Sequence, residues 1–275
     1  MAKEKKVVEE TAVKTTEEKA VVQKPEPIPG LEGIESDMIM IPRLKLVQKM
    51  SEEVDEYEYK PGSLINSVDK EVIMEFSKSS ENTITVIPVK VFRNRIKFIP
   101  VDDGGGMTCQ AQDGKNGVGD PGGKCMMCPH SQWQKDEKEN LPPACTEFLN
   151  VFVLVRGYDF IFPLVLSFGK TSYKTGKKFI NLFLMASQRT QKSPWHLAYK
   201  LGVKPETSDA GTYHVFTIAP GGKSDDEEIL TAENAYKFLM ETEVQVHTDI
   251  DMAKDESSVE EPDHMKKVDD EKSPF

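Results

Sequence analysis

The stretch Thr83-Ile-Thr-Val-Ile-Pro-Val-Lys-Val-Phe-Arg-Asn-Arg-Ile-Lys-Phe-Ile-Pro100 decides the fold class of this chain. It is rich in β-branched and aromatic residues, and apolar and basic residues alternate through its second half. Because successive side chains of a strand point to opposite faces, we expect Ile96 and Phe98 on one face and Arg95 and Lys97 on the other. The sequence therefore predicts a long strand with a basic face.

Segments on both sides of this stretch predict further strands. Phe148–Val155 and Phe160–Phe168 are apolar at nearly every position, which is typical of central strands buried on both faces. The segment Arg156–Asp159 between them is short enough for a tight hairpin turn. Extended or weaker strand patterns occur at residues 38–47, 64–72, 195–201, 212–219 and 244–247.

Helical spacing occurs in two segments only. In Thr171–Ser187, apolar residues recur every three or four positions, and Thr171 or Ser172 is the expected N-cap. Thr231–Met240 predicts a short helix capped by Thr231, and the polar segment 205–211 predicts a loop. The whole pattern predicts a mainly β fold with minor α content, and an OB-fold-like Greek-key barrel with one long insertion is our first choice.

The two ends of the chain differ in composition from its middle. Residues 1–30 hold six Lys and six Glu without a steady period, which is typical of a disordered segment. Residues 248–275 hold ten acidic residues and four Lys, which predicts a disordered acidic tail with a net charge of −6. We therefore expect one folded domain at residues 31–247, with a zinc-binding insertion at residues 102–146.

The charge of the chain limits the ways in which it can bind nucleic acid. The formal net charge is −11, so −5 remains outside the acidic tail. This argues against coating nucleic acid by bulk charge, and any such surface must be a local basic groove. We find no apolar signal segment and no stretch long enough to span a membrane, so we expect no membrane partner and a place in the cytoplasm.

All four cysteines lie in or beside the glycine-rich insertion. Their spacing is Cys109-x15-Cys125-x2-Cys128-x16-Cys145. Two thiolates three residues apart on a turn can face one ion, and four thiolates make a closed, structural Zn²⁺ site. Zinc would also supply folding energy that this polar insertion cannot obtain by burying apolar surface. His130 is a competing ligand, and four reduced cysteines without metal are the plainer alternative.

Basic and aromatic residues occur together in two places, as nonspecific single-strand binders require for phosphates and bases. Solvated lysines and core phenylalanines are the plainer interpretation of both. Trp133 and Tyr158 are further stacking candidates. The candidate DNA-binding residues are Lys90, Phe92, Arg93, Arg95, Lys97 and Phe98 in the first patch, and Tyr173, Lys174, Lys177 and Lys178 in the second.

The sequence shows no phosphate-binding loop, metalloprotease helix, nucleophile elbow or acidic metal cluster, so we expect no enzyme. Three functions remain open. The first is sequence-independent binding of single-stranded DNA. The second is a zinc-ribbon adaptor or transcription regulator that binds a host protein. The third is an accessory subunit of a replication or recombination enzyme.

The chain ends in Val268-Asp-Asp-Glu-Lys-Ser-Pro-Phe275. A terminal aromatic beside a free carboxylate can enter a pocket rimmed by basic residues. The ending resembles the acidic tip of bacterial and phage single-stranded DNA-binding proteins. The segments Phe168–Phe179 and Ile41–Val47 are also similar to phage members of that class, and a zinc-bearing insertion has a parallel in the T4-type phage protein.

The resemblance implies an OB-fold that protects single-stranded DNA during phage replication, recombination and repair, in the host bacterial cytoplasm. It also implies recruitment of a polymerase, helicase-primase or recombinase through the tail, and it allows a homo-oligomer. Bacterial members lack the cysteine cluster, so their tetramer does not carry over. The tail residues implied in partner binding are Asp269, Asp270, Glu271, Pro274 and Phe275.

Overall fold

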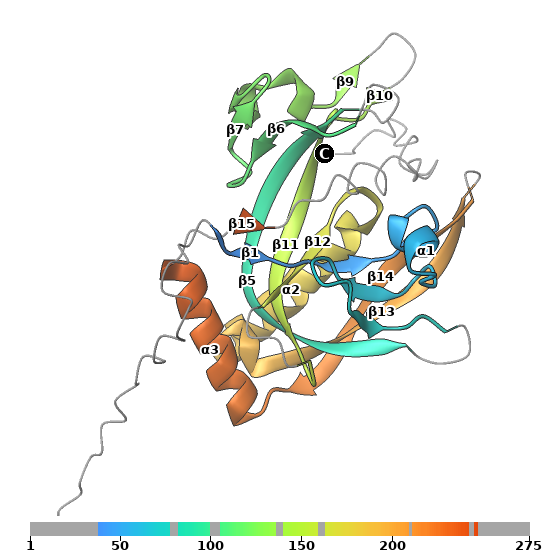
Figure 1. The fold of residues 1–275 in the computed structure, drawn as a ribbon. Helices are drawn as coiled ribbons and strands as arrows, with labels where there is room; N and C mark the ends of the chain where they lie inside the picture. The colour runs from blue at the N-terminus through green and yellow to red at the C-terminus, as the bar shows by residue number, and fades with distance from the viewer. Residues whose placement is uncertain are drawn as a thin grey trace, which may run out of the picture. The chain divides into compact units, whose positions relative to one another are not determined.

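The computed structural model describes residues 38–77, 82–99, 105–135, 140–158, 163–208, 211–241 and 245–246. All of them belong to one compact unit, Ser36–Phe275. The terminal segments predicted at residues 1–30 and 248–275 lie outside the described residues, so what we expect of them stays a prediction. The described fold is mainly β, as the sequence predicts (Figure 1).

The central sheet is built on β5 (Thr83–Phe98), which pairs antiparallel with β11 (Cys145–Val155) along most of its length. The first part of β5 also pairs with β13 (Leu197–Ser208), and its last part pairs with β6 (Met107–Ala111). β12 (Leu164–Phe168) adds to the far side of β11. The order β13-β5-β11-β12 is that of a Greek key, in which the fourth strand returns to lie beside the first.

The Greek-key order is present, but the predicted barrel is not confirmed, because no sheet of described strands closes on itself. A separate sheet of β2 (Leu44–Leu46), β3 (Leu64–Asn66) and β4 (Val72–Met74) reaches β12 on one side of the Greek key and, on the other side, the strand that pairs with β13. It meets β12 through a bridge between Arg43 and Val165. It meets β14 (Gly211–Lys223) through Gln48, whose amide bonds the backbone oxygen and nitrogen of His214 at 2.9 and 3.0 Å. We call this side-chain closure the seam.

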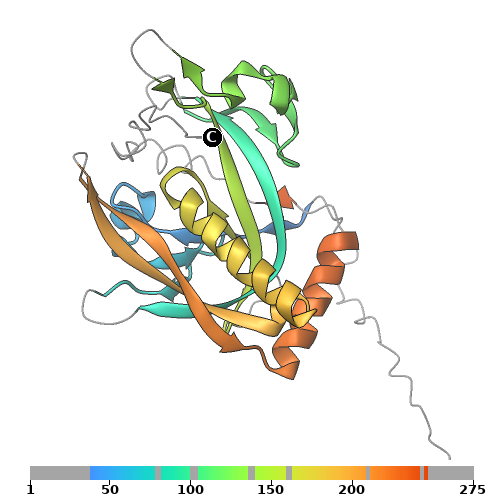
Figure 2. The same cartoon turned by 180° about the vertical axis from the view of Figure 1, so that it is seen from behind.

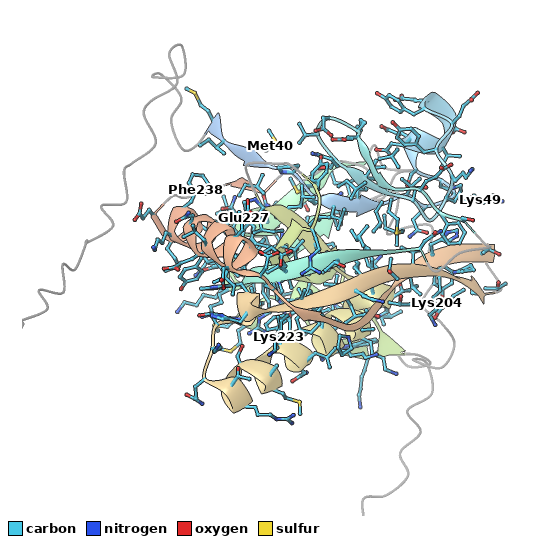
Figure 3. The ribbon with its side chains drawn as sticks, turned by 90° about the horizontal axis from the view of Figure 1, so that it is seen from below. Met40, Lys49, Lys204, Lys223, Glu227 and Phe238 are labelled. Carbon is cyan, nitrogen blue, oxygen red and sulfur yellow. The ribbon has the colours of Figure 1, made fainter. Side chains whose placement is uncertain are left out.

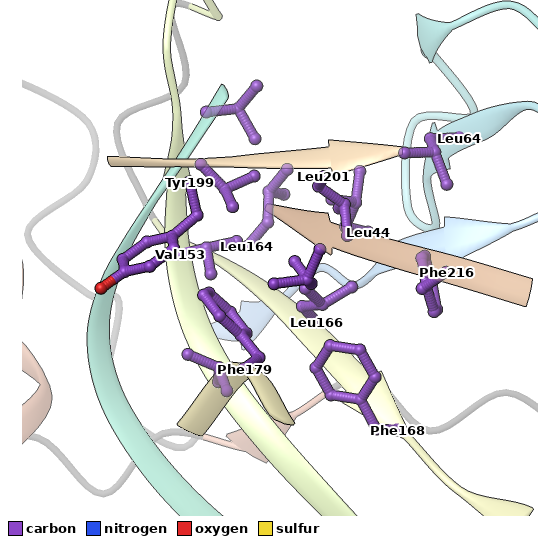
Figure 4. Packing of buried hydrophobic residues seen from close by; sticks show 14 of the residues in the cluster. Leu44, Leu64, Val153, Leu164, Leu166, Phe168, Phe179, Tyr199, Leu201 and Phe216 are labelled. Atoms are coloured by element: carbon purple, nitrogen blue, oxygen red, sulfur yellow. The ribbon is translucent and has the colours of Figure 1, made fainter. Parts of the chain in front are cut away.

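The main hydrophobic core takes side chains from both sheets and from α2 (Tyr173–Thr190). Figure 4 shows Phe168, Phe179 and Tyr199 packing inside the curved strands. Alternate residues of β11 enter this core, and the residues between them contribute to a second cluster on the outer face. The prediction that Phe148–Val155 is buried on both faces is therefore confirmed.

The predicted helix is confirmed as α2, with Phe179 and Phe183 buried. Ser172 precedes its first turn but makes no capping hydrogen bond; its hydroxyl donates to the Gly169 carbonyl instead. Gly176 lies where α2 crosses β12, and a Cβ there would lie 2.6 Å from the Cβ of Phe168. The missing side chain lets the helix pack directly on the strand, along the ribbon of β5 and β11 (Figure 2).

The second helix, α3 (Asp226–Glu241), begins five residues earlier than predicted and covers the outer face of the sheet (Figure 3). Thr231 is not its cap, because the Thr231 hydroxyl donates to Glu227 inside the helix. Asp225 and Glu228 form the capping box instead, each accepting a hydrogen bond from the other's backbone nitrogen. This Asp-x-x-Glu signal was present in the sequence.

The hairpin of β13 and β14 is longer than predicted. Residues 205–208, expected in a loop, continue β13, and Ser208 pairs with Gly211. Polar side chains are tolerated there because the ladder is made by the backbone and the side chains at this end are exposed or half-buried. The predicted strand at residues 244–247 is β15 (Gln245–Val246), which pairs parallel with β1 (Met40–Ile41).

The insertion holds short elements. It contains β6, β7 (Asn116–Gly119), β8 (Gly123–Lys124), the 3-10 helices η3 (Cys125–Met127) and η4 (Pro129–Ser131), β9 (Gln134–Lys135) and β10 (Asn140–Leu141). The remaining described elements are α1 (Glu52–Glu56), η5 (Lys170–Ser172) and η6 (Pro194–His196).

Replacing Gly176 with alanine tests the contact between α2 and β12. Helix propensity alone favours alanine by about 1 kcal/mol. Overpacking against the fully buried Phe168 costs about 1–3 kcal/mol, so we expect Gly176→Ala to lower the free energy of unfolding. Urea unfolding measures the change, with Gln188→Ala on the exposed side of the same helix as control. A variant as stable as the wild type would contradict this prediction.

Candidate nucleic-acid interface

The basic face of β5 begins after a bulge. The register with β11 shifts opposite Phe152 and Val153, so Val89 is the extra residue. Beyond it, Arg93, Arg95 and Lys97 alternate with the buried Asn94 and Ile96. The basic side chains therefore share one face of the ribbon where β5 and β11 extend past the main core.

Glu147 joins this face to α2. It lies opposite Arg95 in the ladder and forms an ion pair with that guanidinium. A carboxylate oxygen of Glu147 also lies 3.6 Å from Nη1 of Arg93 and accepts a 2.8 Å hydrogen bond from the hydroxyl of Tyr173. The two basic patches predicted separately are thus connected by one acidic residue, which sequence reasoning missed.

Tyr173 is half-buried at the start of α2. Burial, followed by the hydrogen bond to Glu147, raises the pKa of Tyr173 to about 12. The ammonium of Lys177, one helical turn later, lies 4.8 Å from the centre of the tyrosine ring. Lys174 and Lys178 are exposed on the same helix, as their positions off the apolar stripe predicted. We call Arg93, Glu147, Tyr173, Lys174 and Lys177 the joined basic face.

Three predicted DNA contacts lie on the opposite face of β5, and this corrects the first patch. Phe92 stacks on Phe152, with ring centres 4.8 Å apart, and Phe98 packs edge-on against Phe148. The amine of Lys90 donates to the Leu239 carbonyl of α3, and burial lowers the pKa of this lysine. Successive side chains of a strand point to opposite faces, so basic and aromatic residues that alternate along β5 do not share one surface.

The two arginines of the basic face differ in how much of each side chain is exposed to solvent. The side chain of Arg93 is 63% exposed, whereas that of Arg95 is 22% exposed. Arg95 also donates to the Ser131 carbonyl at 3.5 Å, so it connects Glu147 to the turn after the cysteine pair. Arg93 is therefore the arginine that is open to a ligand, and Arg95 holds the surrounding elements together.

The four cysteines lie around the end of the same ribbon, all as free thiols. Cys109 on β6 and Cys145 on β11 lie opposite Lys97 on its two sides. Burial raises the pKa of Cys145 to about 11, and the other three cysteines add to the rise while Arg95 opposes it. In the described parts of the chain, no three His, Cys, Asp or Glu side chains form a ready metal-binding group.

The other predicted candidates have separate surroundings. Trp133 is 55% exposed on the insertion, so it stays a candidate for stacking. Tyr158 accepts a hydrogen bond from Asn66 beside the hairpin turn, away from the joined basic face. His130 is half-buried in η4, next to the cysteine pair. The predicted tail residues 269–275 lie outside the described residues.

The fold and this face define a mainly β protein with a Greek-key sheet and a local cationic and aromatic surface. A family model for the Pam3 phage gp34-like protein matches residues 9–245. Because this match covers most of the chain, the chain belongs to that family. No curated protein and no solved structure gives a significant match. No helix in the described part of the chain is long and apolar enough to cross a membrane.

The raised tyrosine pKa predicts a loss of stability at high pH. The neutral phenol of Tyr173 is favoured in the folded state, so its contribution is complete below the unfolded pKa of about 10 and is lost as pH rises to about 12. We expect the melting temperature to fall over this range, and to fall less steeply in Tyr173→Phe. Tyr57→Phe, at an exposed tyrosine outside the joined basic face, is the control. Equal slopes in Tyr173→Phe and the wild type would contradict the assignment.

Proposed function

We propose that this phage protein binds single-stranded DNA without reading its sequence, through the joined basic face. The observation that carries the proposal is the meeting of Arg93, Tyr173 and Lys177 around Glu147, because it places phosphate-binding cations beside an aromatic ring. Nonspecific single-strand binding needs this combination. The chain would then protect single strands during phage replication, recombination and repair in the host bacterial cytoplasm.

The insertion that borders the joined basic face supports the proposal. OB-folds bind oligonucleotides on the face of their second and third strands and with the loops after the first and fourth strands. In the Greek key here, the cysteine insertion follows the first strand, β5, and the hairpin turn between β13 and β14 follows the fourth. The insertion, linked to Glu147 through Arg95, borders the joined basic face.

Tyr173 is the residue that we assign to base stacking. Lys177 covers one side of its ring, and the hydrogen bond to Glu147 fixes the ring's orientation. The phenylalanines predicted for this role, Phe92 and Phe98, are packed against other rings. Glu147 lowers the net charge of the face, so the proposal depends on positioned contacts more than on bulk attraction. It assigns no catalytic residue.

An adaptor that binds a host protein is the second candidate. It is favoured by exposed apolar side chains on the insertion, where Val118, Met126 and Met127 are 80%, 84% and 77% exposed. A contiguous apolar patch formed by these side chains would be typical of a protein-binding surface. Measurements with oligonucleotides separate this candidate from the first, because the adaptor needs no affinity for single strands.

Replacing Arg93 and Tyr173 tests the proposal. Fluorescence anisotropy of labelled oligo-dT, with a duplex competitor and a salt titration, measures binding. In a plot of the logarithm of the binding constant against the logarithm of the salt concentration, Arg93→Ala should lower the magnitude of the slope by about 0.7, which is the contribution of one phosphate contact. Tyr173→Ala should weaken binding about 5- to 150-fold, because stacking contributes about 1–3 kcal/mol per base.

Two exposed residues away from the face serve as matched controls. Lys60 is 63% exposed and ion-paired, as Arg93 is, and Tyr57 is 47% exposed. Lys60→Ala and Tyr57→Ala should bind as the wild type does. Equal losses in control and test variants would reject the joined basic face, and no binding by the wild type at about 50 mM salt would favour the adaptor.

The acidic tail is proposed to compete with DNA for this face and to recruit replication or recombination proteins. Deleting residues 248–275 removes a net charge of −6. We therefore expect tighter binding to oligo-dT at low salt and a smaller difference at high salt, where the attraction is screened. A variant in which residues 248–275 are kept in composition but scrambled in order is the control, because it retains the charge of the tail and loses its sequence. The deletion should also remove stimulation of the phage's own DNA polymerase on a coated template. Unchanged affinity at low salt would exclude the competition.

A further inference from the structure

The cysteine insertion is arranged around Lys97. Antiparallel pairing places Cys109 and Cys145 opposite this lysine on its two neighbouring strands. Residues directly opposite each other in a sheet project from the same face. The two thiols and the ammonium therefore leave the same face at the end of the ribbon.

Glycines keep space around Cys109. A Cβ on Gly117 would lie 2.8 Å from the sulfur of Cys109, so any larger residue there would push the sulfur aside. Gly117 pairs with Gly123 in β8, and β8 leads directly into Cys125. The sulfur of Cys109 thus lies over the glycine strands that deliver the cysteine pair.

The cysteine pair forms a closed turn that is fixed to the sheet. The backbone nitrogen of Cys128 donates to the Cys125 carbonyl at 3.1 Å, and that of Cys125 donates to Lys115 at 2.8 Å. The hydroxyl of Ser131 donates to the carbonyl of Cys128 at 2.9 Å and also to that of Cys125. Arg95 then binds the Ser131 carbonyl, which holds this turn beside β5.

The donor set decides which ion would fit. Four thiolates favour a tetrahedral, soft or borderline metal such as Zn²⁺ over Ca²⁺ or Mg²⁺, which take oxygen ligands. A four-thiolate zinc centre carries a net charge of −2. Arg95 acts electrostatically on both Cys125 and Cys145, and Lys97 lies between Cys109 and Cys145, so two cations oppose that charge.

We propose that Cys109, Cys125, Cys128 and Cys145 bind one Zn²⁺, and that Arg95 and Lys97 balance its charge. The thiols turn toward a common centre on binding, since they form no ready ligand group as they stand. Each thiol loses its proton, so one Zn²⁺ replaces four protons. Lys97 and Arg95, expected from the sequence to contact DNA, act in this site as positioning residues.

Metal analysis of the full chain tests the ligand set without any measurement of DNA binding. We expect one zinc per chain by mass spectrometry after purification without added chelator. We also expect visible absorption of the tetrahedral thiolate type when Co²⁺ replaces zinc. Cys128→Ser and Cys145→Ser should lose the zinc or bind it more weakly, whereas His130→Ala should keep one zinc per chain. A wild-type chain without zinc that also fails to take up added Zn²⁺ would overturn the proposal, and loss of zinc in His130→Ala would overturn the ligand set.

The charge-balancing role has its own test. Lys97→Gln should release zinc to a competing chelator at a several-fold lower chelator concentration than the wild type, while the thermal unfolding of the zinc-free forms stays similar. Lys135→Gln, at an exposed lysine of the same insertion, is the matched control. Equal zinc affinity in the two variants would reject the role of Lys97. Because these measurements use Zn²⁺ alone, their failure is distinguishable from a failure of DNA binding.

Discussion

The antiparallel ladder between β5 and β11 is the interaction on which the other parts of the fold depend. At its Val86–Val155 end both strands are buried, and the ladder forms the centre of the Greek key. At its Lys97–Cys145 end it lies beyond the main core and carries charged and thiol side chains. One ladder, interrupted by the bulge at Val89, therefore joins the buried centre of the fold to the end that carries the joined basic face and the cysteines.

The ladder also determines which side chains can act together. The extra residue at Val89 resets the alternation of β5, so that the arginines turn toward α2 and the phenylalanines turn away from it. Glu147 then meets both arginines and Tyr173 at one point. An acidic chain can in this way present a small cationic surface. The single negative charge of Glu147 holds two arginines in place, so a net positive charge remains at that point.

Much of this fold was predictable from local pattern. The long strand, the apolar strand Phe148–Val155 and the amphipathic helix have strong periodicities, and the structure confirms them. Of the strand predicted at Phe160–Phe168, the structure confirms Leu164–Phe168, and residues 160–162 lie outside the described residues. The errors have physical causes. Thr231 satisfied the rule for a helix cap, but Asp225, six residues earlier, is the cap and forms a reciprocal capping box with Glu228. The role of Glu147 depends on pairing between residues 52 positions apart, which no local pattern contains. The seam at Gln48 and His214 likewise joins residues 166 positions apart, so the sequence could indicate a curved β fold but not how its edges meet.

The placement of the insertion has a consequence for how proteins of this type can diverge. Its short strands and turns continue the ladder at the end that lies outside the main core, and Ile96 and Phe148 pack together there as a separate small cluster. In the described residues, this insertion contacts the ribbon mainly at the Arg93–Phe98 part of β5 and the nearby end of β11. Because surface connections tolerate insertion and deletion far better than core strands do, this end can evolve as an exchangeable module, while the Greek key keeps its sequence constraints.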